Sequence, residues 1–284
     1  MSRRRVEAGE LKKELAPGQS VELLKDLHLV TRDGAMNADT LRKLKQVNHL
    51  VQLVRPALDD VLARFGEPVV VDCGAGKSYL GFILYELFLR DAGKGRLILL
   101  ESREDLVRGA RERSQRLGFD RLEVIGSDIA GATLPPRVNL VVALHACDTA
   151  TDDALTLAIE RGADHVAVVP CCQAEVARQL KERDGESPVM AELHSHPWHR
   201  REFGSHLTNV IRALTLEAHG YSVTVTELAG WEHSLKNELI IGKKVRASNG
   251  DAARRLDQLL ASTGVRPKLT RALAKDVEAP PEAP

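Results

Sequence analysis

The sequence VVVDCGAGKS, residues 69–78, decides the fold of this chain. Its first three residues are apolar and β-branched, which predicts a short buried strand. Gly74 and Gly76 follow at once and predict a tight turn, because glycine lets the backbone bend sharply. The apolar residues of positions 78–90 then recur with the period of a helix. A strand, a glycine turn and a helix in this order are typical of a parallel α/β sheet.

The same alternation continues along the chain. Short apolar runs predict further strands at residues 97–100, 122–125, 138–144, 166–169, 221–228 and 239–245. Helical periodicity is found at residues 105–117, 150–161, 174–182 and 207–218. The last two strands follow one another directly and predict an antiparallel hairpin. We therefore expect an α/β fold, with a seven-stranded, mostly parallel sheet and helices on both faces.

Three parts follow from this pattern. Residues 1–65 form an N-terminal helical extension, in which 37–65 predict an amphipathic helix that Pro56 kinks or splits. Residues 66–245 form the α/β domain, interrupted by a long polar connection at 184–201. Residues 246–284 hold one short helix, at 251–261, and a flexible tail. Residues 1–36 predict no element.

The composition excludes several classes of protein. The 284 residues include 40 Lys and Arg against 40 Asp and Glu, so the net charge is zero and non-specific coating of nucleic acid is excluded. Hydrophobic residues make up 43%, which excludes a disordered chain. Four cysteines are too few for a disulfide scaffold. With neither an apolar span nor a signal peptide, a soluble cytoplasmic protein without a membrane segment is expected.

The glycine turn does not match a phosphate-binding loop. In that motif a glycine stands where this chain has Val71, inside the predicted strand. The dinucleotide-binding fingerprint needs a third small residue, where Tyr79 stands. Nucleoside triphosphates and NAD are therefore weak candidates.

Acidic residues instead follow three successive strands. Asp72 and Glu101 close the first two, and Asp128 follows the third. A carboxylate at Glu101 can accept two hydrogen bonds from a ribose diol. Asp128 can reach an adenine amino group, with Ile129 packed on the ring. Because ligands of open α/β sheets bind at the carboxyl ends of strands, this set predicts an adenosyl ligand that is neutral or cationic.

This arrangement resembles the class I S-adenosylmethionine-dependent methyltransferases, over roughly residues 66–245. The resemblance implies a Rossmann-like methyltransferase sheet, whose final hairpin distinguishes it from dinucleotide-binding domains. It also implies S-adenosylmethionine as the cofactor. The predicted cofactor-binding residues are Asp72, Gly74, Gly76, Tyr79, Glu101, Ser102, Asp128, Ile129 and His145.

Motifs at the ends of the next strands resemble one branch of that family. LHACDTATD at 144–152, PCCQ at 170–173 and a Lys-Asn pair at 236–237 carry the resemblance. The branch contains tRNA 2′-O-methyltransferases of the acceptor stem, eukaryotic methyltransferase-like proteins and glutathione S-transferase C-terminal-domain-containing proteins. Several relatives have glycine where this chain has Asp148, and the tRNA enzymes have histidine where it has Gln173. The resemblance implies methylation of RNA, either tRNA or rRNA.

Three mechanisms fit these residues. In the first, His145, Asp148 or Asp152 acts as a general base, or alignment alone is enough for methyl transfer. In the second, Cys171 or Cys172, together with Cys147, attacks a pyrimidine ring. The third is a zinc site made of these cysteines and one of His194, His196 or His199. We expect no metal, and buried cysteines lining a pocket are the plainest alternative. The predicted catalytic residues are His145, Asp148, Asp152, Cys171 and Cys172.

Substrate contacts are predicted at three places: on the helix before the sheet, beside Trp198 and in the last hairpin. The residues are Lys45, His49, Arg200, Arg201, Lys236 and Asn237. Arginines and a tryptophan suit RNA, through phosphate contacts and base stacking. An Asn/Asp-Pro-Pro-aromatic turn is absent, so methylation of an adenine amino group ranks low. The alternatives are a protein or small-molecule methyltransferase and a non-catalytic scaffold that binds the cofactor.

Overall fold

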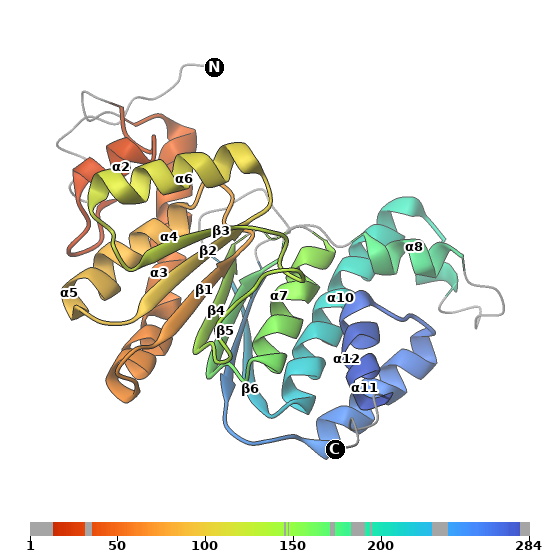
Figure 1. The fold of residues 1–284 in the computed structure, drawn as a ribbon. Helices are drawn as coiled ribbons and strands as arrows, with labels where there is room; N and C mark the ends of the chain where they lie inside the picture. Colours follow the sequence, from red (N-terminus) through yellow and green to blue (C-terminus); the bar gives the residue numbers. More distant parts are fainter. Residues whose placement is uncertain are drawn as a thin grey trace.

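The computed structural model describes residues 14–31, 36–144, 146, 148–170, 174–182, 191–193, 195–228 and 238–278. It contains one seven-stranded sheet in the order β3-β2-β1-β4-β5-β7-β6, with helices on both faces (Figure 1). The strands are β1 (Val69–Cys73), β2 (Arg96–Glu101), β3 (Leu122–Gly126), β4 (Leu140–Leu144), β5 (His165–Val169), β6 (Tyr221–Glu227) and β7 (Glu238–Lys244). The predicted fold and all seven predicted strands are confirmed.

Strand direction fixes where the functional residues gather. β1 to β5 pair in parallel, and β7 is antiparallel to both β5 and β6. The carboxyl ends of β1 to β5 therefore share one edge of the sheet, called here the carboxyl edge. β6 runs in the same direction as β5, because both are antiparallel to β7. The predicted hairpin is confirmed, and ligands of such a sheet bind at the carboxyl edge.

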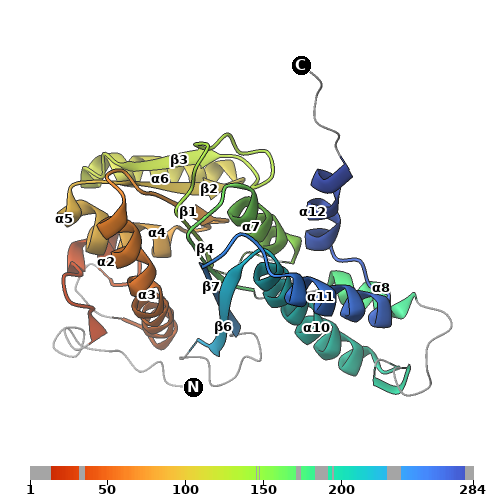
Figure 2. The same ribbon diagram turned by 90° about the horizontal axis from the view of Figure 1, so that it is seen from below.

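The helices form two layers. Figures 1 and 2 show α3, α4 and α6 on one face of the sheet and α7, α10, α11 and α12 on the other. Their bounds are α2 (Val21–Asp26), α3 (Ala38–Arg64), α4 (Tyr79–Leu84), the π-helix η1 (Tyr85–Leu89), α5 (Arg90–Ala92), α6 (Glu104–Leu117), α7 (Thr149–Glu160), α8 (Glu175–Lys181), α10 (Pro197–Ala218), α11 (Gly250–Thr263) and α12 (Lys268–Glu278). Among the described residues, no helix is long and apolar enough to cross a membrane.

Alternate residues of the central strands supply two separate hydrophobic cores. Val70 and Leu97 belong to the core under α3 and α4. Val71 and Ile98 belong to the core under α7. Strand side chains alternate between faces, so a strand covered on both sides must be apolar throughout. This is why the short β-branched runs were recognisable in the sequence.

The helix α3 does not split at Pro56, which was one of the two predicted outcomes. It starts at a capping box between Asn37 and Thr40 and continues to Arg64. Pro56 faces solvent, so water can satisfy the carbonyl that the proline ring leaves without an N–H partner. A proline on the exposed face therefore interrupts one hydrogen bond without ending the helix.

Two helices lie where no element was predicted. The short helix α2 is capped by the Ser20 hydroxyl, which accepts the Leu23 N–H, and its residues Leu23 and Leu24 are fully buried. Helix α12 lies after the predicted helix of residues 251–261, where no second helix was predicted. It is tied down by Lys268, whose ammonium lies 2.6 Å from Asp153 on α7, and by burial of Leu269. Tertiary contacts stabilise both helices more than local sequence does.

The helix α10 begins ten residues earlier than predicted, at Pro197 instead of residue 207. Arg200 and Arg201 thus lie on a helix and not in a polar connection. Proline suits the first turn of a helix, because its missing N–H has no intrahelical partner there. Gly204 lets this part of α10 pack tightly on α8, since a Cβ at Gly204 would lie 2.9 Å from Ala177.

Candidate functional site

The turn after β1 is shaped by left-handed backbone. Gly74 has φ +66° and Gly76 has φ +57°, angles that disfavour other residues. The Ala75 N–H donates to the Leu100 carbonyl at 2.9 Å, which holds the turn against the end of β2. A Cβ at Gly74 would touch Ala146 at 3.7 Å, so the turn lies beside the segment that follows β4. The glycines therefore give a ligand close access to backbone at the carboxyl edge.

Asp72 lies beneath this turn, with 1% of its surface exposed. Its Oδ2 accepts the Gly81 N–H at 3.1 Å, and within the described part of the chain its carboxylate has no further hydrogen bond. Burial raises the pKa of Asp72 to about 7, the negative charge of Glu101 adds to the rise, and the bond from Gly81 opposes it. A cation at the turn would be a natural partner for this carboxylate.

Gly81 is a residue of the site that sequence reasoning missed. A Cβ there would lie 2.2 Å from Leu99 Cδ2 and 3.0 Å from Asp72 Oδ2. Only glycine lets α4 approach β2 closely enough for its N–H to reach the Asp72 carboxylate. A glycine between the large apolar residues Leu80 and Phe82 was the available signal.

Glu101 closes β2 and faces the same turn. Its Oε2 accepts the Gly76 N–H at 2.7 Å, and its Oε1 accepts the N–H and the Nε–H of Arg103, both at 3.0 Å. Burial acts to raise the pKa of Glu101, but the hydrogen bonds from Arg103 and Gly76 outweigh it and the pKa lies below its usual value. The carboxylate is thus ionised and held in place. A ligand diol would replace the Arg103 side chain, which is 62% exposed.

The remaining predicted cofactor residues also lie at this edge of the sheet. Asp128 is exposed in the turn after β3, where its Oδ1 accepts the Gly131 N–H at 2.7 Å. Ile129 beside it is 8% exposed. Ser102 is exposed after β2, and Tyr79 is half-buried at the start of α4. His145 lies outside the described residues.

The residues at this edge fit an adenosyl ligand with a cationic end. Glu101 offers a fixed, ionised acceptor for a diol, and Asp72 offers a buried carboxylate for a positive charge. The glycines leave the turn without side chains between these two groups. No described group of three His, Cys, Asp or Glu residues is arranged to hold a metal ion.

Asp148 has an unusual backbone and a structural task. Its φ is +48° and ψ −117°, a conformation that strains residues other than glycine. Its Oδ1 accepts the Ala174 N–H at 3.0 Å and the Glu175 N–H at 3.4 Å, and Arg178 lies 3.5 Å from its other oxygen. The aspartate therefore caps the start of α8. These contacts hold the Asp148 side chain in place despite its strained backbone.

Asp152 is buried in an ion pair. Its Oδ1 accepts the Arg212 Nε–H at 2.7 Å, and both side chains are at most 2% exposed. Arg212 also donates to Asn209 Oδ1 at 3.1 Å and to the Asp148 carbonyl at 2.9 Å. Burial raises the pKa of Asp152, with Arg212 opposing the rise. Arg212 thus links α10 to α7 and to the turn at Asp148.

The predicted catalytic and substrate residues are only partly described. Cys171, Cys172, Lys236 and Asn237 lie outside the described residues. Lys45 pairs with Glu14 at 3.2 Å near the start of α3, and His49 is half-buried one turn later. The end of α3 lies at the opposite edge, where Arg64 pairs with Asp164 just before β5. The first turns of α3 therefore point towards the carboxyl edge.

The cysteine that is described is not a nucleophile. Cys73 is fully buried at the end of β1. Burial raises the pKa of its thiol well above the usual value, and the charges of Asp72 and Asp153 raise it further. The thiolate, which is the reactive form, is therefore disfavoured.

Comparisons with known proteins find similarity to methyltransferases over part of the chain. Residues 42–179 match a protein-family model described as a methyltransferase domain. A glutathione S-transferase C-terminal domain-containing protein from Bos taurus is 28% identical over 232 residues, covering 74% of this chain and 35% of that protein. The Homo sapiens protein of that name gives the same identity and coverage. The chain thus spans about a third of the length of these curated relatives.

Two solved structures are similar to the chain at low sequence identity. An rRNA methylase from Streptococcus thermophilus is 13% identical with a TM-score of 0.46, covering 69% of this chain and 96% of that one. Magnesium protoporphyrin IX methyltransferase from Synechocystis, with bound SAH, is 12% identical with a TM-score of 0.44. The match covers 84% of this chain and 93% of that one.

Proposed function

We propose that this class I methyltransferase domain, whose cofactor is S-adenosylmethionine, transfers the methyl group to RNA. The observation that carries the substrate class is a surface at the start of α10. It consists of His196, Trp198, His199, Arg200 and Arg201, and is called here the α10 patch.

The α10 patch combines an exposed aromatic ring with cations. Trp198 is 58% exposed, and the Arg201 guanidinium lies 4.5 Å from the centre of its ring. Arg201 also pairs with its neighbour Glu202 at 3.4 Å, an exposed contact that contributes little. His196 and His199 stand edge to face at 5.9 Å. A large exposed ring beside arginine suits stacking on an unpaired base next to a phosphate.

The place of the patch favours a large substrate. Asn209, in the middle of α10, donates to Glu238 at 2.9 Å, where β7 begins at the carboxyl edge. The α10 axis runs antiparallel to β6, so its first turns extend beyond that edge. At 1.5 Å per residue, Trp198 lies about 16 Å further along the helix than Asn209. A small molecule bound at the glycine turn would not reach it, whereas a polynucleotide would.

The residues at the carboxyl edge divide the chemistry as follows. Asp72, the glycine turn and Glu101 would hold the cofactor, which supplies a methyl group activated on sulfonium. Asp148 and Asp152 were both predicted as bases, but a helix cap and a buried arginine occupy their carboxylates. We therefore assign positioning roles to these two residues. His145 is the base we favour, with alignment of the acceptor supplying the rest of the acceleration.

Cofactor affinity should depend on pH through Asp72. Because its pKa is about 7 in the ligand-free protein, the carboxyl is mostly protonated at pH 6, and a cationic ligand must displace that proton. We expect binding of S-adenosylmethionine to be about tenfold weaker at pH 6 than at pH 8. Calorimetry in two buffers of different ionisation enthalpy would measure the released proton. Equal affinity at both pH values, without proton release, would contradict this role of Asp72.

The α10 patch can be tested by substitution. We expect Trp198→Ala to weaken RNA binding about tenfold or more, since base stacking contributes about 1–3 kcal/mol. Affinity for S-adenosylhomocysteine should not change. The measurement is fluorescence anisotropy with labelled RNA. The matched control is Val210→Ala, which removes another exposed apolar side chain further along α10. Equal losses in the two variants would argue against stacking at Trp198.

The substrate class is decided by labelling. Incubation with S-adenosylmethionine carrying a labelled methyl group, together with RNA, protein and metabolite fractions of a cell extract, should place the label in RNA. Digestion of that RNA to nucleosides then identifies the modified atom. Label confined to protein or to small molecules would overturn the RNA proposal and leave the cofactor site intact.

A further inference from the structure

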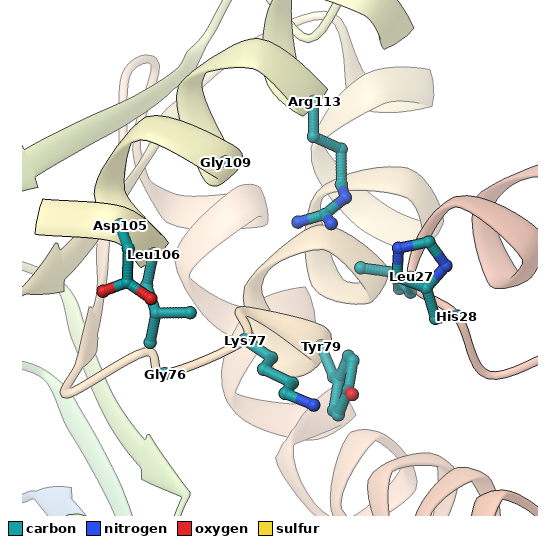
Figure 3. A pocket seen from close by; sticks show the side chains of 9 residues that line it. All are labelled: Leu27, His28, Gly76, Lys77, Tyr79, Asp105, Leu106, Gly109 and Arg113. Carbon is teal, nitrogen blue, oxygen red and sulfur yellow. The ribbon is translucent and has the colours of Figure 1, made fainter. Parts of the chain in front are cut away.

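A cavity of about 180 Å³ lies next to the cofactor turn, between three elements (Figure 3). The residues after α2 form one wall, the end of the glycine turn and the start of α4 form the second, and α6 from Asp105 to Arg113 forms the third. The lining residues are Leu27, His28, Gly76, Lys77, Tyr79, Asp105, Leu106, Gly109 and Arg113.

Four of the five polar side chains that line this cavity are uncommitted. Across the described residues, no hydrogen bond or ion pair engages the side chains of His28, Lys77, Tyr79 or Asp105. Arg113 pairs with Asp26 at 2.8 Å and is 16% exposed. Figure 3 shows Arg113, Lys77 and His28 around the open space, with Asp105 on the side opposite His28. Four free polar groups in one small cavity point to a ligand and not to a structural network.

The walls are fixed before any ligand binds. Leu27 is 1% exposed, and the Ser20 N–H donates to Glu86 at 3.1 Å, so the segment around α2 is anchored to η1. Arg116 joins Arg113 on Asp26, which ties α6 to the end of α2. His28 has φ +56°, an unfavourable conformation for a residue other than glycine. This backbone places its imidazole at the cavity.

We propose that this cavity binds one ribose phosphate unit of the RNA substrate, an inference that rests on the proposed function. The cavity and its border carry three cations, on Lys77, Arg113 and Arg116. They carry only two carboxylates, those of Asp26 and Asp105, so the net charge favours an anion. Lys77 and Arg113 would contact the phosphate. The Asp105 carboxylate, which only accepts hydrogen bonds, would take the ribose 2′-hydroxyl as donor. The Tyr79 ring would pack against the sugar.

A cavity with these contacts would bind RNA more tightly than DNA. A 2′-hydroxyl is the group that a protein uses to distinguish the two, and Asp105 would lose its partner with a deoxyribose. The phosphate contacts carry no such preference. Lys77 should therefore affect both nucleic acids, and Asp105 only RNA.

The first test uses the sugar phosphate itself. Ribose 5-phosphate is titrated, with S-adenosylhomocysteine saturating the cofactor site, and followed by protein NMR. We expect millimolar binding that shifts resonances of Lys77 and Gly109, is at least fivefold weaker for 2-deoxyribose 5-phosphate, and is lost in Lys77→Ala. The control Lys243→Ala, at the opposite edge of the sheet, should bind normally. Absence of binding to the wild type, or equal binding by Lys77→Ala, would overturn the proposal.

The second test uses RNA. Lys77→Ala should weaken single-stranded RNA binding about fivefold and lower the slope of log K against log salt by about 0.7. Gly109→Leu should block the cavity sterically, because a Cβ there meets no atom within 4 Å and the larger residue fits without a clash. Unchanged RNA affinity in both variants would overturn this inference while the proposed function stands. A wild-type protein that binds no RNA would instead refute the proposed function.

Discussion

Replacing Glu101 by glutamine should lower the affinity for S-adenosylmethionine about 100-fold or more. An ionised carboxylate accepts both hydroxyls of a ribose diol, and each such bond is worth about 1.5–3 kcal/mol. Glutamine offers a single neutral oxygen, and the Gly76 N–H already bonds to this side chain. Equilibrium dialysis with labelled cofactor would measure the loss.

The control for this variant is Glu123→Gln. Glu123 is exposed on β3, and it pairs in register with Ile98 on β2, the strand that carries Glu101. The same change of charge there should leave cofactor affinity unaltered. If both variants lose affinity equally, general electrostatics would explain the effect. If neither does, the ribose is not bound at Glu101.

The second large effect concerns the buried pair of Arg212 and Asp152. Arg212→Met should lower the free energy of unfolding by about 3–5 kcal/mol, because it leaves a buried carboxylate without its partner. Adding Asp152→Leu should restore part of that loss, since an apolar pair no longer buries an uncompensated charge. Urea unfolding of the single and double variants gives the coupling between them.

Arg254→Met is the matched arginine control. Arg254 pairs with Asp251 at 2.7 Å, but the two side chains are 71% and 64% exposed. Loss of such a surface pair costs at most about 1 kcal/mol. Strictly additive losses in the Asp152 and Arg212 variants would contradict a coupled buried pair. Arg212→Met should also reduce methyl transfer more than cofactor affinity, because Arg212 holds the Asp148 carbonyl.

The sheet was predictable because local sequence and burial agree there. Each central strand is covered on both faces, so most of its residues are apolar and stand out from the polar segments around them. The elements that were missed lack such a signal. Helix α12 depends on ion pairs such as Lys268 with Asp153, and the first turns of α10 depend on packing at Gly204.

The convergence of the candidate cofactor residues was predictable from topology. Parallel strands bring Asp72, Glu101 and Asp128 to one edge, whatever lies between them in the sequence. The roles of Asp148 and Asp152 could not be predicted, because their hydrogen-bond partners are far away in the sequence. Ala174 lies 26 residues from Asp148, and Arg212 lies 60 from Asp152. A carboxylate after a strand looks available as a base until the fold shows what occupies it.

A crystal structure of the complex with S-adenosylhomocysteine tests the cofactor site at atomic detail. It should place both ribose hydroxyls within hydrogen-bond distance of the Glu101 carboxylate, with the Arg103 side chain displaced from it. The amino-acid end of the ligand should lie at the turn formed by Gly74 and Gly76, near Asp72. A ligand bound elsewhere, with the 3.0 Å bond between Arg103 and Glu101 intact, would contradict the site.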